Sequence, residues 1–91
     1  MQTARHSQID FACQLEAMRK HDRVPAVRET CRLTGGTLTM PGRTSWGPHQ
    51  AELFLMGQSA FGTDANEAIR NWIACVLRKA TAEQFEQQEV A

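Results

Sequence analysis

Apolar side chains near the start of the chain follow the spacing of a helix. Phe11, Leu15 and Met18 stand at i, i+4 and i+7, the positions that share one helix face. Ser7 precedes this stripe, and serine is a favoured N-cap because its hydroxyl accepts a hydrogen bond from a free amide of the first turn. The pattern predicts a first helix over residues 8–21.

Proline and glycine mark the limits of a second helix. Pro25 lacks an amide hydrogen and clashes with the preceding turn, so we expect the chain to break at residues 22–24. Proline suits a first helical turn, which predicts a second helix over residues 25–34. Gly35 and Gly36 follow, and glycine takes the left-handed conformation of a helix C-cap at low cost.

After these glycines the apolar period changes from near 3.6 to 2, which is typical of strands with one buried face. Residues 37–40 alternate small polar with apolar side chains, and residues 51–56 form the most apolar candidate strand. Gly57 has two interpretations: it begins a tight turn into a third strand over residues 58–61, or it marks a bulge in one long strand. We favour the bulge, because the loop over residues 41–49 already provides a hairpin connection.

A wide apolar stripe with a capped start predicts a long helix in the C-terminal third. Asp64 and Glu67 have the spacing of a capping box, in which two side chains bond free amides of the first turn. Trp72 is the largest member of the stripe, so we expect this helix to pack across the sheet and anchor the core. The apolar positions are Ala65, Ala68, Ile69, Trp72, Ile73, Val76, Leu77 and Ala80.

These elements predict an α+β fold with two N-terminal helices, an antiparallel β-hairpin or three-stranded sheet, and a long C-terminal helix packed on the sheet. With 91 residues the chain has room for one domain, which we place at residues 1–82. Residues 83–91 keep a helix-forming composition but lose the apolar stripe, so we expect an acidic tail that frays. So short a chain has a thin core, which self-association would supplement.

Charge is balanced over the whole chain and divided between its halves. Ten Lys and Arg offset ten Asp and Glu, which argues against a nonspecific polyanion binder, since such binding needs many cations. Residues 1–48 carry seven basic and four acidic side chains, a net charge of +3, and residues 49–91 carry three and six, a net charge of −3. The halves either attract each other, within the fold or across a head-to-tail dimer, or form ordinary solvated faces.

The cysteines form no metal or redox pattern. Cys13, Cys31 and Cys75 include no C-x-x-C pair, and no Cys or His pair has the spacing of zinc ligands. Each lies among apolar residues of a predicted helix, where a free thiol behaves as a small hydrophobe. We therefore expect three core cysteines, no metal and no cofactor.

Catalytic motifs are incomplete. Ser59 follows Gly57 as in a nucleophile elbow, but Phe61 occupies the position of the required second glycine. Gly57 and Gly62 have the spacing of a phosphate loop, yet Thr63-Asp64 replaces the Lys and Ser/Thr that such a loop needs. None of the three histidines has an acid/base partner at a recognisable spacing. We expect that the protein is not an enzyme.

Two segments are candidate partner-binding sites. The loop with Arg43, Trp46 and His49 carries residue types enriched at interface hot spots, and its tryptophan either folds over the core or projects. Basic residues gather around the first two helices and either meet an acidic protein or nucleic acid or form a solvated face. They are Arg19, Lys20, Arg23, Arg28 and Arg32, of which we select Arg23, Arg28 and Arg32 as site residues.

Residues 57–69 contain a glycine, a short strand, a second glycine and then Glu-Ala-aliphatic at the opening of a helix. This stretch, GQSAFGTDANEAI, resembles the strand-to-helix signature of HicB-type antitoxin domains. Followed by Asn71-Trp72, it is also similar to small accessory proteins of phages and prophages. HicB-type domains usually begin with strands, whereas two predicted helices come first here. The resemblance implies a compact protein that binds and occludes a partner protein without catalysis.

We therefore predict a noncatalytic protein-binding module, an accessory or inhibitor protein of a phage or mobile element, whose partner is a host- or element-encoded protein. Self-association into a homodimer is a further option. The alternative is a nucleic-acid-binding domain, because with three strands the order resembles the αβββα order of double-stranded RNA-binding domains. Those domains place lysines at the start of the last helix, where this chain has Asp64-Ala65-Asn66-Glu67.

The sequence also bears on location. No apolar run reaches the roughly 18 residues that a membrane span needs. The first residues, Met1 to His6, lack the apolar middle of a secretory signal. We therefore expect a cytoplasmic protein.

Overall fold

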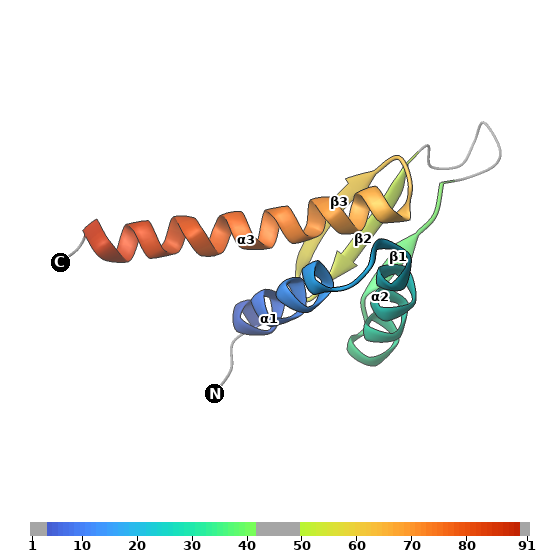
Figure 1. The fold of residues 1–91 in the computed structure, drawn as a ribbon, viewed down its shortest axis with the longest axis horizontal. Helices are drawn as coiled ribbons and strands as arrows, with labels where there is room; N and C mark the ends of the chain where they lie inside the picture. Colours follow the sequence, from blue (N-terminus) through green and yellow to red (C-terminus); the bar gives the residue numbers. More distant parts are fainter. Residues whose placement is uncertain (1–3, 42–49, 90–91) are drawn as a thin grey trace.

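Three helices and a three-stranded sheet make up the computed structural model, which describes residues 4–41 and 50–89, with side chains for residues 7–41 and 50–83. The order is α1 (Ala4–Ala17), α2 (Lys20–Thr34), β1 (Thr37–Thr39), β2 (Ala51–Leu55), β3 (Gln58–Gly62) and α3 (Ala65–Glu89). The strands form one antiparallel sheet in the order β1-β2-β3. The long helix α3 packs on β2 and β3, and α1 and α2 lie beside it (Figure 1). The predicted α+β fold is confirmed.

The break between the first two helices lies earlier than the proline predicts. It falls at residues 18–19, so the expected break at residues 22–24 is wrong and Pro25 lies inside α2. Pro25 is close to the start of α2, where a missing amide removes only one of the first hydrogen bonds of the helix. Across the break as the structure has it, the Arg23 Nε donates to the Leu15 carbonyl near the end of α1, at 2.8 Å.

Three helix ends were predicted from the sequence, and the structure agrees with the prediction at two of them. α1 begins at Ala4, so Ser7 lies within the helix and is not its N-cap. Gly35 caps α2 in the left-handed conformation, with φ 84°. At the start of α3, the Asp64 carboxylate accepts the Glu67 amide at 2.8 Å. The Glu67 carboxylate accepts the amide of residue 63, one position before the expected one.

Gly57 belongs to a turn, so the sheet has three strands and the favoured bulge is wrong. Met56 and Gly57 both have positive φ, 52° and 81°, as in a two-residue type I′ turn, whose twist matches that of the strands it joins. The indole Nε1 of Trp72 contacts both strands at this turn. It donates to the carbonyls of Leu55 and Gln58 at 3.3 and 3.1 Å.

The core lies between α3 and the inner face of the sheet, and α1 and α2 close its sides. Trp72 is fully buried at its centre and makes an edge contact with Phe11, with ring centroids 6.0 Å apart and planes at 69°. The buried cluster consists of Phe11, Ala12, Leu15, Val27, Cys31, Ala51, Leu53, Leu55, Ala60, Ala68, Ile69, Trp72, Ile73 and Val76.

The cysteines differ in burial. Cys31 is buried and Cys75 is half-buried, but Cys13 is exposed, so the expectation of three core cysteines is wrong for Cys13. The reason is helical geometry. Cys13 is two residues from both Phe11 and Leu15, which places it about 200° around α1 from the buried stripe.

The last helix is longer than its apolar stripe. The stripe ends at Ala80, yet α3 continues to Glu89. The backbone of residues 83–89 is therefore helical in the structure. Fraying of residues 83–91 stays a prediction about the protein in solution.

Gly62 lets the end of β3 approach the start of α3 closely. A Cβ there would lie 2.7 Å from the carbonyl carbon and 2.8 Å from the Cβ of Glu67. Because one of these is a backbone atom, it cannot rotate away. Gly35 differs, since a Cβ there would meet open space and only its positive φ disfavours another residue.

These two glycines give a matched pair of substitutions. We expect Gly62→Ala to lower the free energy of unfolding by about 3 kcal/mol or more, because β3 and α3 must separate. Gly35→Ala should cost about 1 to 2 kcal/mol, the penalty of a left-handed alanine. Urea denaturation followed by circular dichroism measures both, and equal unfolding midpoints would contradict the close approach at Gly62.

Candidate functional site

The outer face of the sheet is a candidate binding surface. Strand alternation places Leu53, Leu55 and Ala60 on the inner face, where all three are buried. The outer face carries the intervening side chains, and among the described elements α3 packs against its opposite side. The outer side chains are Thr37, Thr39, Glu52, Phe54, Ser59 and Phe61.

Two phenylalanines on this face are half-exposed. Phe54 is 43% and Phe61 is 47% exposed. Phe54 pairs with Ser59 and Phe61 pairs with Glu52, so the two aromatic residues are diagonal neighbours on adjacent strands. Diagonal neighbours lie about 7 to 8 Å apart, within reach of aromatic side chains. Together they place two half-exposed aromatic rings on a face whose other side chains are three hydroxyls and one carboxylate.

This pair was missed at the sequence level because it depends on the turn. In one continuous strand, residues 54 and 61 are seven positions apart and point to opposite faces. The two-residue turn at Met56 and Gly57 reverses the chain and brings both rings to the same face. The sequence does contain one indication of an outward apolar side chain: residues 51–56 have more apolar residues than a strand with one buried face requires.

The free edge of β3 is less accessible to an added strand than the outer face is to a partner. A two-residue turn makes residues 55 and 58 a hydrogen-bonded pair, so the Ser59 and Phe61 carbonyls point away from β2. Side chains occupy both: Gln58 Nε2 donates to the Ser59 carbonyl and Asn71 Nδ2 to the Phe61 carbonyl, each at 2.7 Å. An added strand would have to displace them, which protects the edge from pairing.

The predicted loop site lies outside the described residues. Arg43, Trp46 and His49 fall in residues 42–49, which connect β1 to β2. Their part in binding stays a prediction.

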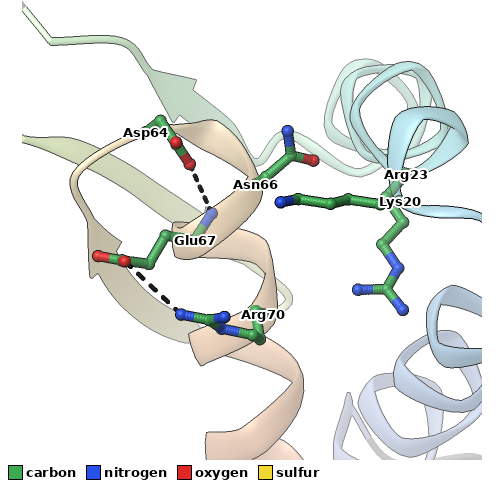
Figure 2. A pocket seen from close by; sticks show the side chains of 6 residues that line it. All are labelled: Lys20, Arg23, Asp64, Asn66, Glu67 and Arg70. Carbon is green, nitrogen blue, oxygen red and sulfur yellow. Dashed lines mark hydrogen bonds and ion pairs between the residues drawn. The ribbon is translucent and has the colours of Figure 1, made fainter.

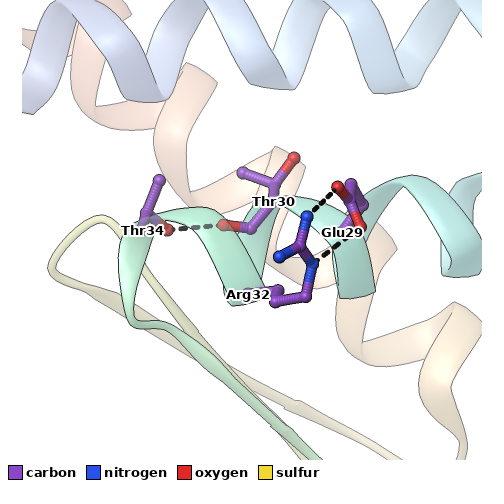
Figure 3. Close-up of polar contacts among 4 residues, drawn as sticks. All are labelled: Glu29, Thr30, Arg32 and Thr34. Atoms are coloured by element: carbon purple, nitrogen blue, oxygen red, sulfur yellow. Dashed lines mark hydrogen bonds and ion pairs between the residues drawn. The ribbon is translucent and has the colours of Figure 1, made fainter.

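The three predicted basic residues on α2 differ in their exposure and contacts. Arg23 is half-buried and bonds α1, whereas Arg28 is exposed. Arg32 donates to both Glu29 carboxylate oxygens, at 2.6 and 3.1 Å, in an exposed pair (Figure 3). These hydrogen bonds lower the pKa of Glu29 and raise the pKa of Arg32. Arg32 is therefore already paired, which weakens its case as a partner contact.

A cavity of about 200 Å³ lies where α2 meets the start of α3. Lys20, Arg23 and Arg70 line it together with Asp64, Asn66 and Glu67 (Figure 2). Both carboxylates already bond backbone amides, and Glu67 also lies 3.6 Å from Arg70. The Asn66 Oδ1 is buried and has no hydrogen-bond partner in the described part of the chain. No local pattern in the sequence links Arg70 to this cavity, because Arg70 is 47 residues from Arg23 and only the fold brings them together.

Within the described ranges, 4–41 and 50–89, no three His, Cys, Asp or Glu side chains are placed to hold a metal ion. Among the helices described there, none is long and apolar enough to cross a bilayer. The outer sheet face carries hydroxyls, aromatic rings and one carboxylate, a combination suited to contact with another surface.

Comparison of the chain with protein-family models, with curated proteins and with solved structures gives no match.

The difference in burial between the cysteines predicts their order of modification. Burial raises the pKa of the Cys31 thiol, so less thiolate forms at neutral pH, and its sulfur is also shielded. In the native protein at pH 7.5, Cys13 should react with iodoacetamide about tenfold or more faster than Cys31, which reacts after local opening. Peptide mass spectrometry over time measures both rates, and equal rates would contradict the burial of Cys31.

Proposed function

We propose that this protein is a noncatalytic protein-binding module that covers a surface of another protein with the outer face of its sheet. The observation that carries the proposal is the pair Phe54 and Phe61, both half-exposed on one face. Aromatic residues are enriched at the centres of protein interfaces because they bury a large area with few rotamers. Around them, Thr37, Thr39 and Ser59 supply hydroxyls that form hydrogen bonds at a polar rim.

The charge of the face supports a protein partner over a nucleic acid. Its six described side chains include one carboxylate, Glu52, and no Lys or Arg. Nucleic-acid binding depends on cations that neutralise phosphates, even where aromatic rings stack on bases. A partner with an apolar patch fits this face better.

The narrower proposal is an accessory or inhibitor protein of a phage or mobile element, which acts in the cytoplasm by occluding a host- or element-encoded protein. The resemblance of residues 57–69 to HicB-type antitoxin domains supports it. Those positions form the junction of β3 with α3, so the resemblance assigns no binding residue. The resemblance favours antitoxin-like or antidefence-like inhibition as the mode of action.

Partner capture tests the role of the sheet face. We expect the full chain to retain a stoichiometric protein from a bacterial lysate, and Phe54→Ser combined with Phe61→Ser to weaken that complex about 100-fold or more, since hot-spot truncations cost about 2 kcal/mol each. Titration with the purified partner by calorimetry measures the loss. Trp46→Ala and Arg43→Ala test the loop in the same assay.

Leu33→Ser is the matched control for this experiment. Leu33 is 68% exposed and lies on α2, outside the strands that form the outer sheet face. It removes a large exposed apolar side chain and should leave the affinity unchanged. Binding that survives the double phenylalanine change in a folded protein would contradict the proposal.

A second candidate function is a small nucleic-acid-binding domain. The order α2-β1-β2-β3-α3 favours it, because it matches the αβββα order of the alternative. Lys20, Arg23 and Arg70 also gather at the start of α3, where double-stranded RNA-binding domains place lysines. Asp64 and Glu67 line the same cavity and repel phosphate, which is why we rank this function second.

A gel shift separates the two functions. For a protein-binding module we expect no retardation of duplex RNA or duplex DNA by micromolar protein at low salt. If duplex RNA is retarded, and Lys20→Glu combined with Arg70→Glu abolishes the shift, the second function replaces the first.

A further inference from the structure

Glu52 lies on the outer face of the sheet, next to both half-exposed phenylalanines. It belongs to β2, the central strand, so it has a neighbour on each side. Its partner in β3 is Phe61, and its partner in β1 is Thr39. Phe54 is two residues further along β2 and points to the same face, about 7 Å away. The neighbours of this carboxylate are therefore two aromatic rings and a hydroxyl.

The pairing of Glu52 with Phe61 is of the close type. Residues 55 and 58 form a hydrogen-bonded pair at the turn, and the two types of pair alternate along the strands, so residues 52 and 61 form a non-hydrogen-bonded pair. The Cα atoms of such a pair are about 4.5 Å apart, and the side chains approach closely. Glu52 is half-buried, so its carboxylate has already lost part of its contact with water.

The described part of the chain supplies no cation to this carboxylate. The three described strands contain no Lys, Arg or His. Within residues 7–41 and 50–83, whose side chains are described, Glu52 forms no ion pair and accepts no hydrogen bond. A carboxylate that loses more water when a partner covers the face needs a cation in exchange. The partner is the source of that cation.

Arginine is the cation that suits these neighbours best. Its guanidinium is planar, so one face stacks on an aromatic ring while its N–H groups donate in the same plane to a carboxylate. The hydroxyl of Thr39 can accept a further N–H. A lysine ammonium is more strongly hydrated and has no flat face to stack on a ring. The arrangement of carboxylate, ring and hydroxyl therefore favours a guanidinium over an ammonium.

We propose that the outer face of the sheet receives an arginine side chain of the partner protein, stacked on Phe61 and paired with Glu52. Phe54 contacts apolar side chains around that arginine. This inference rests on the proposed function, because it names the chemistry of the surface that covers the same face. The partner patch is apolar with an arginine at its centre, and arginine is one of the residues enriched at interface hot spots.

Titration of the isotope-labelled full chain with Nα-acetylarginine amide tests the site by nuclear magnetic resonance. We expect the ring signals of Phe61 and the carboxylate signal of Glu52 to shift together, with a dissociation constant in the millimolar range. Nα-acetyllysine amide should bind about threefold or more weakly, because it cannot stack and pair at once. Nα-acetylcitrulline amide has the same shape without the charge and should shift neither signal. Equal shifts with the arginine and citrulline compounds would overturn the proposal.

Two matched variants locate the charge that binds. Glu52→Gln keeps the shape of the side chain and should weaken binding of acetylarginine amide about fivefold or more. Glu16→Gln removes the same charge from an exposed position on α1, outside the strands, and should leave the binding unchanged. Equal effects of the two variants would contradict a site at Glu52. If Arg43→Gln strengthens binding about threefold or more, the site belongs to Arg43 of the same chain, and the assignment to a partner is wrong.

The captured partner separates this inference from the proposed function. In the calorimetric titration, Glu52→Gln should weaken the complex about tenfold or more, because it leaves the partner's arginine unpaired in a covered interface. If the double phenylalanine change removes the complex and Glu52→Gln leaves it intact, the arginine site is wrong and the proposed function stands. If neither change weakens the complex in a folded protein, both proposals fail.

Discussion

Burial of Trp72 beneath the β2–β3 turn is the interaction on which the rest of this structure depends. The indole packs against Phe11 of α1, and its Nε1 donates to the carbonyls of Leu55 and Gln58. One side chain therefore joins α3, the sheet and α1. A buried indole N–H without an acceptor would cost about 1 to 3 kcal/mol, so its two acceptors fix where α3 lies on the sheet.

The same contact determines which side chains form the proposed binding face. Once Trp72 and the neighbouring aliphatic side chains occupy the inner face, strand alternation turns Phe54 and Phe61 outward. Gln8 adds to this constraint, since its Nε2 donates to the Met56 carbonyl at 2.5 Å within the turn. The turn is thus held by side chains of α1 and α3, which explains how a methionine is kept at positive φ.

The division of charge along the chain gains a structural meaning from the fold. Lys20 and Arg23 of the basic half meet Arg70 of the acidic half at one cavity. The acidic end of α3 lies far along the longest axis, away from that cavity (Figure 1). Within one molecule the fold keeps these two regions apart.

The sequence alone determined the elements whose signals are local. Glycine at the end of α2, the cap formed by Asp64 and Glu67, and the stripe around Trp72 each depend on residues within one or two turns. These signals gave the α+β class and the helix on the sheet. Their physical basis is the backbone conformation and the amides at helix ends, which neighbours in sequence satisfy.

Only the tertiary structure decided the features that depend on distant partners. Pro25 indicated a break at residues 22–24, but the break lies at residues 18–19, where Arg23 bonds the Leu15 carbonyl. Gly57 allowed either a turn or a bulge, and the structure has the turn, whose carbonyls accept hydrogen bonds from Gln8 and Trp72. The outward face of Phe54 and Phe61 and the meeting of Arg23 with Arg70 follow from those choices. The reason is that register, break points and shared cavities are set by contacts between residues far apart in sequence, which local periodicity does not specify.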